Sequence, residues 1–156
     1  MLNVKIILLS IFIFIFINNC TYQRINLPDQ KRFFIQEINV SGDSRSAFII
    51  KKKINRFSNK ESENRIILNI KLTKKKDVLE KNIQNKITKY KVGLSAEVEI
   101  RELGREKKLV RFYSNERSYD VDDQYTVTVN NAKNIDKELI NLIVTKILDE
   151  LRIYYN

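Results

Sequence analysis

The sequence of 156 residues contains no histidine, one cysteine, one proline and only three glycines. Without histidine, the chain has no Ser-His triad, no Cys-His dyad, no histidine zinc site and no histidine pH switch. The lone Cys20 has no disulfide partner within the chain. The glycines are scattered, so no glycine-rich loop is present to cradle a phosphate. These absences exclude the kinds of site named above, and we expect no metal ion and no cofactor.

The one long apolar run lies at the N-terminus, directly before that cysteine. Lys5 provides a positive charge, and residues 6–17 are almost entirely Ile, Leu and Phe. This pattern is typical of a secretory signal peptide, and the run is shorter than the roughly 20 residues that a transmembrane helix needs. Ile17-Asn18-Asn19-Cys20 resembles the bacterial lipobox, whose cysteine receives a diacylglycerol and becomes the new N-terminus. Residues 1–19 are thus predicted to be a lipoprotein signal peptide, and Cys20 to be lipidated.

The two neighbours of Cys20 bear on this prediction. Asn19 is larger than the Gly, Ala or Ser that usually precedes a lipobox cysteine, so a plain secreted protein or an N-terminally anchored one remains an alternative. Thr21 follows the cysteine, where an Asp would retain an enterobacteria-like lipoprotein in the inner membrane, so Thr21 favours the outer membrane. Several acyl chains, such as palmitate, would hold the protein there, whereas a single chain binds only marginally.

The composition is basic, with 29 Lys and Arg against 19 Asp and Glu and a net charge of +10. Such a chain favours acidic partners, which include nucleic acid, anionic lipid headgroups and phosphorylated glycolipid. Export weighs against nucleic acid, and the sequence has neither an RNA-binding aromatic strand motif nor zinc-finger spacing. The joint richness in Ile, Asn and Lys also fits AT-rich coding, so the charge is a weak functional signal. We expect no nucleic-acid partner.

The mature chain is predicted to comprise a tether and one domain. Residues 20–31, which include the only proline, predict a lipidated tether, and residues 32–156 predict a single domain. Its first strand is expected at residues 33–40, with Phe34, Ile38 and Val40 on one face. A helix is expected at residues 45–57, with an apolar stripe formed by Ala47, Ile50, Ile54 and Phe57. Phe48 and Ile49 are expected to widen this stripe.

The clearest pattern is strict apolar–polar alternation from Tyr90 to Ile100. It predicts a strand longer than the usual five or six residues, with one buried face and one wet face in an antiparallel sheet covered on one side. Residues 65–73 predict a second such strand, while residues 74–86 fit a short helix, a loop or a strand extension. Residues 109–113 predict a further strand, and residues 118–121 and 125–129 are expected to continue the β structure.

The last expected elements are a polar break at residues 130–134 and a helix from Ile135 to the C-terminus. The order is one strand, a helix, three or four strands and a helix. It predicts an α+β fold, a two-layer sandwich of a mainly antiparallel four-stranded sheet with two helices packed on one face.

This order, behind a lipobox-like start, resembles the lipopolysaccharide-assembly lipoprotein family (LptE). The resemblance is carried by Thr88-Lys89-Tyr90-Lys91-Val92 opening the long strand, by Ser118-Tyr119-Asp120-Val121, and by the closing helix over residues 135–155. It covers nearly the whole mature chain. Members often carry a Gly-Phe-x-Pro-Leu-Tyr-like segment soon after the cysteine, whereas residues 21–28 here share only scattered Tyr, Leu and Pro. This departure concerns the tether's contact with its partner more than the fold.

The resemblance implies a function at the outer membrane. The protein would be lipid-anchored at the periplasmic face and would assemble with and plug the LptD β-barrel translocon, assisting lipopolysaccharide transport and insertion. It would not be an enzyme. The alternative is a small envelope lipoprotein of another class, which binds an anionic ligand or belongs to a different barrel-assembly machine.

The candidate anion-binding residues fall into two groups. Lys89, Lys91 and Arg101 share the polar face of the long strand, and Lys74-Lys75-Lys76 form a basic run. Lysine and arginine bind lipopolysaccharide phosphates by charge-assisted hydrogen bonds, although a basic run is also an ordinary solvated surface. Glu97 and Glu99 point the same way and imitate the carboxylate pair of glycoside hydrolysis, but the sequence indicates no cleft, and an ordinary wet strand face explains them.

Overall fold

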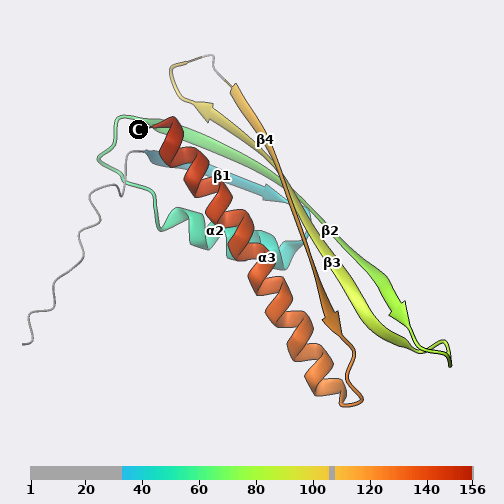
Figure 1. The fold of residues 1–156 in the computed structure, drawn as a ribbon. Coiled ribbons are helices and arrows are strands. Elements are labelled where there is room, and N and C mark those ends of the chain that lie inside the picture. The colour runs from blue at the N-terminus through green and yellow to red at the C-terminus, as the bar shows by residue number, and fades with distance from the viewer. Residues whose placement is uncertain (1–32, 106–107, 156) are drawn as a thin grey trace, which may run out of the picture.

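The computed structural model describes residues 33–105 and 108–155. Within them lie β1 (Phe34–Ser41), α2 (Ser44–Asn55), β2 (Arg65–Lys81), β3 (Ile87–Glu102), β4 (Lys108–Asp120) and α3 (Tyr125–Tyr154). The strands form one sheet in the order β1-β2-β3-β4, and both helices lie on the same side of it (Figure 1). The predicted two-layer α+β fold is confirmed. The predicted signal peptide, Cys20 and the tether lie outside the described residues.

The sheet is antiparallel except at one edge. β2 pairs antiparallel with β3, and β3 with β4, whereas β1 runs parallel to β2. The parallel pair arises because α2 carries the chain back between the two strands, as a parallel connection requires. The prediction of a mainly antiparallel sheet therefore holds.

The core lies between the sheet and the helices, and it follows the alternation of the sequence. Ile66, Leu68, Ile70 and Leu72 of β2 are buried, and so is every second residue of β3 from Val92 to Ile100. The helices contribute buried side chains at helical spacing, which are Ile50, Ile54, Leu139, Ile143, Ile147 and Leu151. Each such side chain stabilises the fold by about 1.5–3 kcal/mol, and the polar residues that alternate with them lie on the other side of the sheet.

The turn from β1 into α2 depends on Gly42 and Asp43. Gly42 has φ +105°, and a Cβ at this position would lie 2.0 Å from the carbonyl oxygen of Leu72. Asp43 caps the helix by accepting a hydrogen bond from the Ser46 amide at 2.9 Å, and this bonding to Ser46 lowers the pKa of Asp43. The turn can therefore pack tightly on β2 only with glycine before the cap.

Two predicted apolar faces are corrected by the structure. In β1 the register shifts between Ile35 and Glu37, and Ile35 is buried together with Ile38. The predicted alternation from Phe34 fails because this β-bulge changes the parity of the strand. In α2, Phe48 does not widen the buried stripe, because its side chain is 69% exposed.

The region after β4 was expected to be β structure and then a polar break, and this expectation is wrong. Residues 125–134 form the first three turns of α3. The β-branched residues there favour strands, but the preceding turn starts a helix. The Thr128 hydroxyl accepts from the Asp122 amide at 2.8 Å and donates to the Asp122 carbonyl at 3.1 Å. Local side-chain bonding of this kind overrides intrinsic propensity.

Residues 74–86 fitted a short helix, a loop or a strand extension by sequence. In the structure they extend β2 to Lys81 and then form the turn into β3. The resulting hairpin continues beyond the helices (Figure 1). None of the helices in the described part of the chain is long and apolar enough to cross a membrane.

Candidate functional site

The candidate site is the side of the sheet that carries no helix, which we call the open face. The side chains that alternate with the buried ones along each strand point to this face. They include Asn39, Asn69, Lys71, Thr73, Lys75, Ser95, Glu97, Glu99, Lys108, Phe112, Ser114 and Glu116. The sequence predicted such a wet face for the long strand, and all four strands contribute to it.

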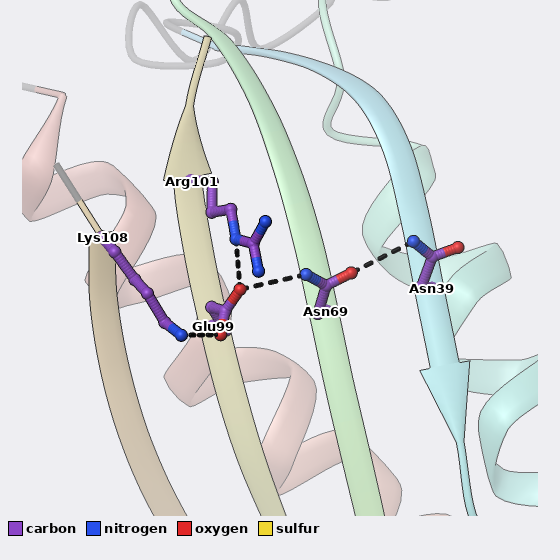
Figure 2. A network of polar contacts seen from close by, with 5 residues as sticks. All are labelled: Asn39, Asn69, Glu99, Arg101 and Lys108. Carbon is purple, nitrogen blue, oxygen red and sulfur yellow. Dashed lines mark hydrogen bonds and ion pairs between the residues drawn. The ribbon is translucent and has the colours of Figure 1, made fainter. Parts of the chain in front are cut away.

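The open face is organised around Glu99. Its carboxylate accepts hydrogen bonds from Asn69 at 3.2 Å and from Arg101, and it forms an ion pair with Lys108. Asn69 in turn accepts from the amide of Asn39 at 3.1 Å. Figure 2 shows this network reaching from β1 to β4 across every strand. Hydrogen bonding to Lys108 is the main cause that lowers the pKa of Glu99 to about 2.

This network bears on the carboxylate-pair interpretation of Glu97 and Glu99. A carboxyl group held ionised by two cations is a poor proton donor, whereas glycoside hydrolysis needs one carboxyl of the pair to be protonated. Glu97 forms no ion pair among the described residues, and it borders shallow hollows of the surface. Glu99 therefore has a structural explanation, whereas Glu97 is an unpaired residue of the wet face, and the absence of enzymatic activity stays a prediction.

The three candidate cations of β3 lie on the open face as predicted, but each is paired. Lys89 contacts Glu80 at 3.1 Å and Asp120 at 3.5 Å, Lys91 contacts Glu116 at 3.1 Å, and Arg101 contacts Glu99. The hydrogen bond to Glu80 is the main cause that raises the pKa of Lys89. Lys89 and Arg101 are also about 40 Å apart along the strand, at roughly 3.3 Å per residue. The structure thus does not bring these cations into one site.

The basic run Lys74-Lys75-Lys76 is divided between the two faces of the sheet. Lys74 points to the helix side and pairs with Asp136 of α3 at 2.7 Å. Lys76 lies on the same side, with its ammonium 3.7 Å from the Tyr90 ring centroid. Only Lys75 points to the open face, because strand side chains alternate. The run is therefore not a single anion site.

Two hollows border the open face, and Lys71 lines both of them. A hollow of about 570 Å³ lies where β1 and α2 meet, and its lining includes Phe48, Lys51 and Lys71. A second, of about 350 Å³, is lined by Lys71, Thr73, Ser95, Phe112 and Ser114 among others.

Lys71 and Phe112 are the residues that the sequence interpretation missed. Lys71 forms no ion pair among the described residues, and Phe112 is 75% exposed. The alternation of β2 already placed Lys71 on the wet face, whereas nothing in the short pattern around Phe112 indicated its exposure. No group of residues that could hold a metal ion occurs in the described part of the chain.

Comparisons with known proteins identify the fold. No protein-family model matches the chain, and no curated protein matches its sequence. Rare lipoprotein B from Shewanella oneidensis superposes with a TM-score of 0.56 at 12% identity, over 74% of this chain and 92% of that chain. A minor lipoprotein from Acinetobacter baumannii gives 0.58 at 13% identity, over 79% and 92%. Lipoprotein B from Nitrosomonas europaea gives 0.53 at 12% identity, over 81% and 86%. The chain therefore shares the fold of these bacterial lipoproteins.

Proposed function

We propose that this protein is an outer-membrane lipoprotein, anchored through Cys20 at the periplasmic face, that plugs an LptD-like β-barrel and assists lipopolysaccharide transport. It acts by binding and carries out no catalysis. The observation that carries this proposal is the open face, a sheet four strands wide whose polar side no helix covers (Figure 1).

The shape of the open face suits the wall of a large barrel. β2 has 17 residues and β3 has 16, which corresponds to about 55 Å at roughly 3.3 Å per residue. This exceeds the hydrocarbon thickness of a bilayer, which is about 30 Å. A domain standing along the barrel axis would thus contact the lumen over its whole depth.

The chemistry of the open face suits a wet lumen. Its cations are mostly neutralised by carboxylates, as in the network of Figure 2, and Phe112 supplies an exposed aromatic contact. Interfaces of this kind combine a polar surface with a few aromatic anchors. The fold shared with bacterial lipoproteins supports the lipoprotein part of the proposal.

Direct contact with lipopolysaccharide would use the cations that are free. Lys71 lies beside Thr73 and Ser95 in the hollow of about 350 Å³, so an ammonium and hydroxyls are available for a phosphate. Glu97 lines the same hollow directly opposite Lys71, and its carboxylate opposes an anion there. Lys89, Lys91 and Arg101 would first have to leave their carboxylates. This hollow also serves the alternative function, a small envelope lipoprotein of another class that binds an anionic ligand.

The proposal is tested by purifying the full chain from membranes under gentle detergent extraction. We expect a large outer-membrane β-barrel to co-purify, and Phe112→Glu to abolish this association. Ile153→Glu is the matched control, because Ile153 is equally exposed, at 76%, but lies on α3. A chain that purifies alone, or equal loss in the two variants, would contradict the proposal. Capture of an anionic ligand without a barrel would favour the alternative.

A further inference from the structure

The far end of the β2–β3 hairpin carries an apolar surface that the domain leaves uncovered. Ile83 is fully exposed in the turn, and Val78 and Leu79 are about half exposed, at 46% and 47%. Figure 1 shows this end projecting away from both helices. We call Val78, Leu79 and Ile83, with the turn that joins the strands, the hairpin tip.

The tip is held in a defined shape by its own hydrogen bonds. The Asn82 side chain accepts from the amides of Gln84 at 3.0 Å and Lys86 at 2.9 Å, and the Asn82 amide donates to the Lys86 carbonyl at 2.9 Å. Asn85 takes up the left-handed conformation, with φ +62°, which asparagine tolerates well. The turn therefore fixes Ile83 in solvent, where a polar residue would be the ordinary choice.

Unpaired lysines surround this apolar surface. Lys81 and Lys86 form no ion pair among the described residues. The carboxylate of Glu80 is already engaged by Lys89 at 3.1 Å, and Asp77 is the other acidic residue beside the tip. The tip thus combines three exposed aliphatic side chains with two free ammonium groups and a net positive charge.

We propose that the hairpin tip docks into the surface of an anionic phospholipid layer. Ile83, Val78 and Leu79 would enter the boundary between headgroups and acyl chains, while the lysines extend to the phosphates. Charge complementarity selects this occupant over a protein. Lysine is depleted from protein–protein interfaces, whereas basic residues beside an apolar surface are attracted to anionic membranes. This inference goes beyond the proposed function and does not require a barrel partner.

The chain has no tryptophan, so a single introduced tryptophan reports its own surroundings. The full-length chain carrying Ile83→Trp is reconstituted into vesicles of equimolar phosphatidylcholine and phosphatidylglycerol. We expect its emission to move to shorter wavelength, brominated acyl chains to quench it, and vesicles to shield it from acrylamide. Phe112→Trp is the matched control, an aromatic replacement on the open face, which should stay accessible to acrylamide.

The lysines are tested in the Ile83→Trp background. Lys81→Gln and Lys86→Gln should each lower the ratio of docked to undocked tip about fivefold, and added salt should do the same. These exposed replacements leave the core intact, so a loss of quenching reports docking and not unfolding.

Three results would overturn the proposal. The first is a tryptophan at position 83 that stays as accessible to acrylamide with vesicles as without them. The second is equal quenching at positions 83 and 112, which would mean that the open face lies on the membrane. The third is equal quenching in pure phosphatidylcholine, which would exclude recognition of anionic headgroups.

Discussion

The two halves of the β2–β3 hairpin are built on different principles. In the half next to the helices, Ile66, Leu68, Ile70 and Leu72 alternate with polar residues and are buried. In the projecting half, every β2 residue after Leu72 is exposed, and backbone pairing continues with ion pairs such as Lys89–Glu80. Both strands of the first half contribute to the core, whereas in the second half only β3 does, through Val92 and Leu94 with Tyr90 packed against them. The hairpin beyond Tyr90 contributes no residue to the core and is available for contacts outside the domain.

The largest expected effect lies in the core beneath the first half. Ile143→Ala should lower the free energy of unfolding by about 2–5 kcal/mol, because Ile143 is fully buried and a cavity would remain. Urea denaturation measures the change. A loss below about 1 kcal/mol would mean that the helix layer is not packed on the sheet as described.

The next effect concerns the turn that packs on β2. Gly42→Ala should cost about 2–4 kcal/mol, since it combines a left-handed backbone with a Cβ driven into the Leu72 carbonyl. Gly104→Ala is the matched control: Gly104 also has positive φ, at +86°, but a Cβ there meets nothing within 4 Å. Thermal or urea unfolding should show the larger loss for position 42, and equal losses would refute the close approach.

A smaller effect is expected from the network on the open face. The pKa of Glu99 is lowered from 4.5 to about 2 in the folded protein. The stability that ionised Glu99 gives to the folded state is therefore complete above pH 4.5, and it is lost as the pH falls through the folded-state pKa near 2. Glu99→Gln should therefore flatten the acid side of the stability profile. Glu97→Gln is the control, because Glu97 lies on the same face without an ion pair. The same flattening in both variants would argue against the network.

The smallest effect on stability is expected at the hairpin tip. Ile83→Ala should change the free energy of unfolding by less than about 0.5 kcal/mol, because Ile83 is fully exposed. Urea denaturation beside Ile143→Ala makes the contrast direct. A loss comparable to the core variant would show that the tip folds against the domain and would remove the distinction between the two halves.

The sequence predicted those parts of the fold in which burial sets a period. The alternation from Tyr90 to Ile100 and the helical spacing after Ile135 both identified buried faces correctly. The errors fell where local bonding decides the structure. The β1 bulge at Ile35 changed a parity, and the Asp122–Thr128 hydrogen bonds turned a β-branched stretch into helix.

The site was less predictable than the fold, because pairing across strands depends on register. Lys89, Lys91 and Arg101 were placed on the correct face. The carboxylate partners of Lys89 and Lys91 come from the neighbouring strands, whereas that of Arg101 is Glu99 of the same strand. Lys71 looked ordinary in sequence; the register of β2 and β3 places Glu97 directly opposite it, yet no ion pair joins the two side chains. A face can thus be assigned from alternation, whereas the free cations on it cannot.

The central claim is that the open face contacts a barrel, and a crosslinking scan along β4 tests it most directly. A photoreactive phenylalanine analogue is placed in turn at Val110, Arg111, Phe112, Tyr113, Ser114 and Asn115, which alternate between the open face and the helix side. The proposal predicts crosslinks to one large outer-membrane barrel with a period of two, strong at 110, 112 and 114 and weak at 111, 113 and 115. Crosslinks without that period, or none to a barrel, would contradict it.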